Sequence, residues 1–196
     1  MQTGFVRRYG MLLILAVGGY LCQVCIMPYV KILGVTPNLL YVIIGIVTVA
    51  YGKLRAFWVG LFYGLLMQIM LPSVTYLDLA LYGLTTLFCS FAFADKPLKT
   101  LEYERAVNRR RKELPPWLRT LLCAMVNTLI HEVVRVTYIY LGGSALTFGH
   151  FFRAFVCVVL TGLLCLLLEF PLRRAILGRR IARPVLQPAP VVFGRG

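Results

Sequence analysis

Acidic residues, and charged residues in general, are scarce in this chain. Of its 196 residues, 7 are Asp or Glu, and charged residues make up 14% of the total while apolar residues make up 60%. Soluble domains carry about a quarter charged and about half apolar residues. A soluble fold of this length has too small an interior for so much apolar surface, so the composition predicts that lipid forms part of the solvent.

The few acidic side chains also limit the chemistry that this chain can perform. It has no nucleophile elbow, no phosphate-binding loop and no paired carboxylates. Its histidines, His131 and His150, belong to no HExxH motif, and its cysteines lie inside apolar runs, where thiols behave as small apolar residues. We therefore predict that the protein is not an enzyme and that it uses no cofactor and no metal.

Six apolar runs within residues 1–177 predict an all-α fold, namely a polytopic membrane bundle of about six transmembrane helices in a single domain. Thr36 is the expected N-cap of the second helix, with Pro37 at its first helical position. Pro171 is expected to end the sixth helix. The expected spans are 11–30, 37–51, 56–71, 76–94, 117–141 and 147–170.

The second and third expected spans are short. Each has about 15 residues, or about 23 Å of helix, against a hydrocarbon core about 30 Å thick. A re-entrant hairpin is therefore the alternative to two full crossings. We favour two crossings, because a hairpin would place Lys53 and Arg55 at membrane depth.

Positive charge is plentiful and unevenly distributed, with a formal net charge of +14. Of the 21 basic residues, 18 lie before the first span, between the second and third, from the end of the fourth to the start of the fifth, or after the sixth. These four segments alternate so that they share one side of the membrane. The positive-inside rule places both termini and the loop 95–116 in the cytoplasm. It explains the basic excess without nucleic acid as a partner.

The loop 95–116 is predicted to contain a short amphipathic helix. A basic cluster follows it, formed by Arg109, Arg110, Arg111 and Lys112. Two interpretations of this cluster are open: contact with anionic membrane lipids of the inner leaflet, or a docking surface for a cytoplasmic partner protein. The Pro- and Arg-rich segment 178–196 is predicted to be a mobile cytoplasmic tail.

The fifth span carries the densest set of polar residues in the apolar runs. Asn127, His131 and Arg135 are four residues apart and share one helical face. Glu132 is three residues from Arg135, so an ion pair between them is expected. Ionisable groups are costly in a bilayer, so this intramembrane polar cluster must face other helices or a water-filled cavity. Two roles are open: internal pairing that serves packing, or a site for a small ligand or partner on the outer side.

Other ionisable residues lie near the ends of the spans, where long side chains reach water. Asp78 and Arg153 are expected near the outer ends of the fourth and sixth spans, and Glu169 near the inner end of the sixth. Asp78 is a possible charge partner of Arg135 or Arg153, because all three lie toward the outer side.

The third span contains a repeat of small residues that favours close helix packing. Ala56, Gly60 and Gly64 lie on one helical face, and Gln68 continues this face one turn further. In an apolar helix such spacing lets another helix approach closely. Packing within the bundle and dimerisation are both compatible with it, and we favour packing within the bundle.

Three short motifs carry a resemblance to a known family. Residues 34–40 read G-V-T-P-N-L-L, residues 60–66 read G-L-F-Y-G-L-L, and the turn L-P-S-V at 71–74 leads into a span with Leu77 and Gly83. In this pattern the stretch 32–84 resembles the bacterial rod shape-determining protein family MreD. The length and the six-span plan also fit. Gln68 stands where the family typically has an aspartate.

The resemblance implies a non-enzymatic component of the cell-elongation machinery in the bacterial inner membrane. Such a component helps to organise peptidoglycan synthesis and rod shape by binding partner proteins. The implied partners are a coiled-coil membrane protein of the MreC type, the actin-like MreB, RodA and a penicillin-binding transpeptidase. The family's fold is similar to the substrate-binding S-component of energy-coupling-factor transporters. That similarity supplies an alternative function, the binding of a vitamin from the outer side.

Overall fold

The structure, a computed structural model, describes residues 2–70, 76–94, 114–143 and 147–177. This part of the chain forms six α-helices, in agreement with the all-α fold and the helix number predicted above. A short 3-10 helix at Met27–Tyr29 follows α1. The α-helices are α1 (Gln2–Cys25), α2 (Leu39–Tyr51), α3 (Lys53–Met70), α4 (Leu77–Phe93), α6 (Pro116–Leu141) and α7 (Phe148–Leu177).

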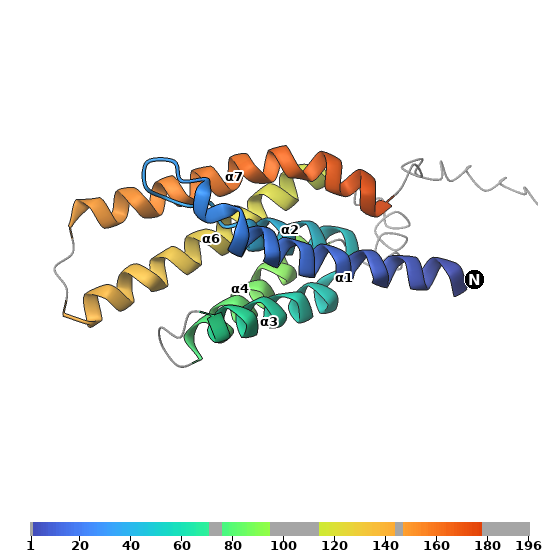
Figure 1. The fold of residues 1–196 in the computed structure, drawn as a ribbon, viewed down its shortest axis with the longest axis horizontal. Helices are drawn as coiled ribbons and strands as arrows, with labels where there is room; N and C mark the ends of the chain where they lie inside the picture. Colours follow the sequence, from blue (N-terminus) through green and yellow to red (C-terminus); the bar gives the residue numbers. More distant parts are fainter. Residues whose placement is uncertain (1, 71–75, 95–113, 144–146, 178–196) are drawn as a thin grey trace, which may run out of the picture.

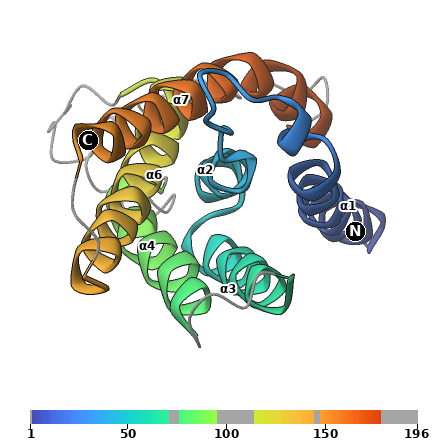
Figure 2. The same cartoon turned by 60° about the vertical axis from the view of Figure 1, so that its left-hand side comes forward.

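Helix α2 lies at the centre of the bundle. Figure 2 shows it end-on, surrounded by α1, α3, α4, α6 and α7. Every residue from Leu39 to Val49 is buried. The sequence explains this position, because α2 is apolar on all sides and a helix without a polar face is stable only when it is enclosed. The other five helices therefore cover α2 on all sides.

The outer surface of the bundle suits a membrane. Three helical segments, Tyr9–Tyr29, Pro116–Leu141 and Phe148–Arg174, are long and apolar enough to cross one. Large apolar side chains are exposed along α1 and α7, among them Leu13, Ile14, Phe155, Leu163 and Leu167. Exposed apolar surface of this extent is rare on soluble monomers.

The start of α1 and the end of α7 lie at the same end of the bundle (Figure 1). The turn between α2 and α3 lies at this end too. Lys53 is 4.5 Å from the ring centroid of Phe91, near the end of α4. Arg55 donates a hydrogen bond of 3.1 Å to the Tyr9 hydroxyl on α1. We call this end, which also carries Arg119 and Arg174, the basic end. Helix α2 has 13 residues and is too short to be one of the candidate spans, so whether α2 and α3 cross the membrane fully or form a hairpin stays a prediction.

Helix α1 and the 3-10 helix that follows it contain the segment Tyr9–Tyr29, which is long and apolar enough to cross a membrane and lies close to the predicted span 11–30. The predicted end of the sixth helix needs correction. Helix α7 continues through Pro171 to Leu177. Proline removes one backbone donor, but transmembrane helices tolerate this where neighbouring groups satisfy the freed carbonyl.

The small-residue face of α3 packs inside the bundle against α4. Ala56 is fully buried. A Cβ atom added to Gly60 would lie 2.6 Å from Thr86 Oγ1, and one added to Gly64 would lie 2.8 Å from Leu79 Cα. The two glycines thus allow α3 and α4 to approach more closely than any side chain would permit. Gln68 follows on this face and is half-buried.

The predicted amphipathic helix, the basic cluster of residues 109–112 and the predicted tail 178–196 lie outside the described residues.

Candidate functional site

The segment 34–38, which leads into α2, is held by side chains from three surrounding helices. The backbone N–H of Asn38 donates to Thr161 Oγ1 on α7 at 3.0 Å. The Asn38 side-chain amide donates to the Tyr82 hydroxyl on α4 at 3.1 Å. The N–H of Leu39 donates to Gln23 Oε1 on α1 at 2.7 Å. Irregular backbone at membrane depth requires partners of this kind.

Asn38, and not Thr36, is the N-cap of α2. Its Oδ1 accepts hydrogen bonds from the N–H groups of Leu40 at 3.1 Å and Tyr41 at 3.4 Å. The Thr36 carbonyl accepts instead from the Cys157 thiol on α7 at 3.7 Å. The prediction of Thr36 was wrong because both residue types favour N-caps, and the helix begins two residues later than the proline suggested.

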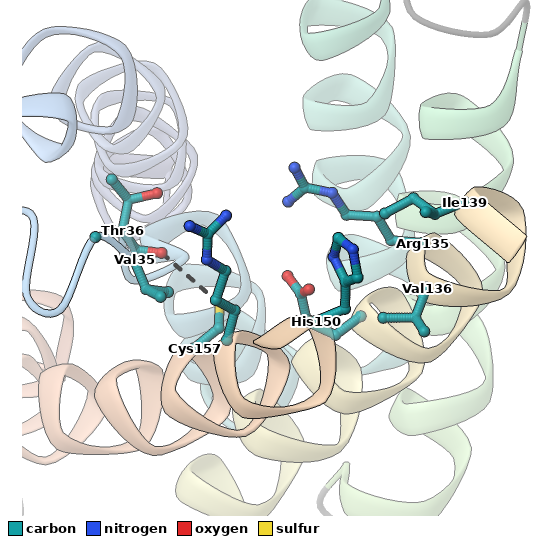
Figure 3. Close-up of a pocket in the computed structure, with 10 residues that line it drawn as sticks. Val35, Thr36, Arg135, Val136, Ile139, His150 and Cys157 are labelled. Carbon is teal, nitrogen blue, oxygen red and sulfur yellow. Dashed lines mark hydrogen bonds between the residues drawn. The ribbon is translucent and has the colours of Figure 1, made fainter. Parts of the chain in front are cut away.

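Two adjoining cavities lie beside this segment, at the end of the bundle opposite the basic end. The larger has a volume of about 560 Å³ and the smaller about 300 Å³. We call them together the polar hollow. The residues that line both cavities are Thr36, Glu132, Arg135, Ile139 and Cys157. Figure 3 shows the smaller cavity, with Arg135 from α6 and His150 from α7 on one side and Thr36 on the other.

Three members of the predicted polar cluster reach the hollow, and the fourth does not. His131, Glu132 and Arg135 line the larger cavity. Asn127 is fully buried one turn deeper, where its amide donates to the Cys123 carbonyl at 2.9 Å. Asn127 therefore belongs to the packing of the bundle, and the other three residues belong to the surface of the hollow.

The charges in the hollow do not pair as the sequence spacing predicted. Glu132 Oε1 lies 3.8 Å from His131 Nδ1, and this is the ion-pair contact that Glu132 makes within the described residues, in place of one with Arg135. Asp78 lines the larger cavity together with Arg135. Arg153 lines the smaller cavity. In the described part of the chain, neither arginine lies within 4.0 Å of a carboxylate oxygen.

Three aromatic rings pack together beside the larger cavity, and two of them, Tyr82 and His131, line it. Tyr41 and Tyr82 stack with their ring centroids 4.7 Å apart. The His131 ring lies 5.6 Å from Tyr41 and 5.7 Å from Tyr82. Both tyrosines are buried. Contact with two rings holds the His131 imidazole in place at the inner edge of the hollow.

Sequence reasoning missed Tyr41, Tyr82 and Gln23 as parts of this site. Each places a hydroxyl or amide within an apolar run, where a polar group needs a partner. That signal was present in the sequence. What the sequence did not show is that the start of α2 packs against Gln23, Tyr82 and Thr161, and that Tyr41 stacks on Tyr82.

A buried carboxylate, that of Glu169, lies near the basic end. The Glu169 side chain is 2% exposed, and its Oε1 lies 3.4 Å from the Arg173 guanidinium on the next turn of α7. Thr120 on α6 and Ile46 on α2 line the same small void. The expectation that Glu169 extends to water is therefore wrong, because the side chain points toward the centre of the bundle.

Breaking this pair should destabilise the bundle. We expect Arg173→Met to lower the free energy of unfolding by about 2 to 3 kcal/mol, because it leaves a buried carboxylate without its cation. The loss is smaller than for a fully buried pair, because Arg173 is partly exposed and solvent screens its charge. Adding Glu169→Gln should restore most of the loss, since the buried charge is then gone. Arg174→Met, on the exposed neighbour, is the matched control. Thermal unfolding in detergent measures all three, and equal effects of Arg173→Met and Arg174→Met would contradict the pairing.

Comparisons of the chain with protein-family models, with curated proteins and with solved structures gave no match.

Proposed function

We propose that this protein is a non-enzymatic inner-membrane component of the cell-elongation machinery, of the MreD type, which acts by binding partner proteins. The observation that supports this most is where the motif residues lie. The G-V-T-P-N segment at 34–38 anchors the central helix, and Gly60 and Gly64 form the contact between α3 and α4. Two of the three motifs that carry the resemblance thus provide contacts within the bundle, and the turn at 71–74 lies outside the described residues.

The orientation belongs to the same proposal. The start of α1 and the end of α7 lie at the basic end, which would face the cytoplasm, and the polar hollow would face the outer side. On that side a coiled-coil partner of the MreC type would have its main domain. The exposed apolar faces of α1 and α7 are available to the membrane helices of RodA or of a penicillin-binding transpeptidase.

The proposal is tested by depletion and by purification from native membranes. Depletion of the protein should convert rod-shaped cells to round ones, and mild detergent should recover it with a single-span coiled-coil protein. Re-expression of the wild type should restore the rods, whereas a Gly64→Leu variant, which we expect not to fold, should not. Rods that persist after full depletion would contradict the proposal.

A second candidate is an S-component that binds a vitamin, and the larger cavity favours it. A volume of about 560 Å³ is within the range of small-molecule sites, and the lining combines apolar groups such as Leu81 and Met67 with polar ones. This candidate predicts that the purified protein carries a small molecule and associates with ATPase subunits. Native mass spectrometry of the same preparation separates the two candidates.

A further inference from the structure

We propose that the smaller cavity of the polar hollow binds a phosphate group, and that this phosphate belongs to the headgroup of a phospholipid. The inference goes beyond the proposed role in cell elongation and does not depend on it. It rests on the placement of Arg135, Arg153 and His150 around one cavity, and on the depth of that cavity.

The two arginines come from different helices and line the same space. Arg135 lies on α6, six residues before the helix ends at Leu141, and Arg153 lies on α7, five residues after it begins at Phe148. Both line the smaller cavity, as does His150. At 1.5 Å per residue, the arginines are about 9 Å and about 8 Å from the ends of their helices. They are therefore at similar depth.

The charge of this cavity is not balanced by the protein. Two guanidinium groups and one carboxylate, that of Glu132, line it, so the positive charges outnumber the negative ones. In the described residues neither guanidinium has a carboxylate oxygen within 4.0 Å. A bound anion between the two arginines would relieve their mutual repulsion.

Exposed tyrosines place the cavity at headgroup depth. Tyr29, Tyr76, Tyr138 and Tyr140 are all exposed at this end of the bundle. Tyrosine is enriched where the hydrocarbon meets the headgroups. The early turns of α7 that carry His150 and Arg153 also carry the exposed Phe151 and Phe155. These turns therefore contact lipid on one face and line the cavity with another.

Arginine is better suited to bind a phosphate group than a side chain that acts as a simple point charge. Its planar guanidinium donates two parallel hydrogen bonds to the oxygens of one phosphate, and two arginines can serve different oxygens of the same group. A volume of about 300 Å³ accommodates a glycerophosphate headgroup but not the acyl chains, which would stay among the lipids. A soluble phosphate ester offers the same chemistry, so the test must separate these two sources.

The test uses the full-length protein in neutral detergent, titrated with short-chain phosphatidylglycerol and observed by native mass spectrometry. We expect one saturable site. Arg135→Gln and Arg153→Gln should each weaken binding roughly tenfold, as expected for the loss of a charged hydrogen bond. Arg174→Gln removes the same charge at the other end of α7 and should leave binding unchanged. Arg135→Lys and Arg153→Lys keep the charge without the paired donors. The affinity of these variants for the lipid should lie between that of the wild type and that of the glutamine variants.

A competition arm identifies the source of the phosphate. Glycerol phosphate that displaces the lipid only at far higher concentration supports a lipid headgroup. Displacement by glycerol phosphate at equal concentration would overturn the lipid assignment in favour of a soluble ester. The site itself is overturned if no saturable binding occurs, or if Arg174→Gln weakens binding as much as Arg135→Gln. Thermal unfolding of each variant identifies any that is misfolded. If a glutamine variant is misfolded, the lysine variant at the same position is compared with the wild type instead.

Discussion

Replacing Gly64 by leucine is expected to prevent the bundle from folding. A Cβ atom at this position would lie 2.8 Å from Leu79 Cα and 3.0 Å from the Asp78 carbonyl oxygen. These are backbone atoms of α4, so no side-chain rotation can relieve the clash. Gly64→Ala should already cost about 1 to 3 kcal/mol, the usual range for overpacking. A leucine side chain requires the two helices to separate.

Gly18→Ala is the matched control for this prediction. Gly18 lies in the middle of α1, and a Cβ atom there would meet nothing within 4 Å. Alanine should be neutral at that site or stabilising by up to about 1 kcal/mol, because it is the better helix former. Size-exclusion chromatography in detergent, with thermal unfolding of the eluted protein, measures both variants. A Gly64→Leu protein that elutes as a sharp peak with wild-type stability would show that α3 and α4 are not in contact.

Asn38→Ala is expected to have the second-largest effect. The substitution removes the cap from the N–H groups of Leu40 and Tyr41, at about 1 kcal/mol. It also removes the donor to the buried Tyr82 hydroxyl, which adds about 1 to 3 kcal/mol. The sum is a loss of about 2 to 4 kcal/mol in the free energy of unfolding. Because α2 lies at the centre, its first turn cannot loosen without disturbing the packing of several helices.

A further variant divides this effect. Tyr82→Phe removes the acceptor of the Asn38 side-chain amide and keeps the cap. In a double-mutant cycle, Asn38→Ala and Tyr82→Phe should be coupled by about 1 kcal/mol, since they share one hydrogen bond. Thermal unfolding of the four proteins provides the measurement. Strict additivity would mean that this hydrogen bond does not form.

The number and order of the helices were predictable because each is a separate apolar run. Their ends were less predictable. The end of α2 is fixed by Gly52, whose φ of +90° favours glycine, and α3 follows at once from Lys53. Pro171 looked like the end of α7, but the helix continues to Leu177, since transmembrane helices tolerate an internal proline. The central position of α2 depends on how the other helices pack around it. The lack of a polar face on α2 is consistent with that position.

The sequence predicted which residues form the site better than it predicted the contacts that they make. His131, Glu132 and Arg135 were found from their cost at membrane depth, and they do line one hollow. Their pairing depends on α4, α7 and the segment 34–38, which sequence spacing within α6 does not describe. His131 therefore packs on Tyr41 and Tyr82, and Arg135 faces the cavity that Arg153 also lines.

The orientation of the bundle is the claim on which the proposed function most directly depends. Truncated chains that end at Lys112 and at Gly143, each fused to green fluorescent protein or to alkaline phosphatase, test it most directly. The phosphatase folds only where its disulfides form, outside the cytoplasm. We predict fluorescence without phosphatase activity at Lys112, and phosphatase activity without fluorescence at Gly143. The reverse pattern would place the polar hollow in the cytoplasm and contradict the account.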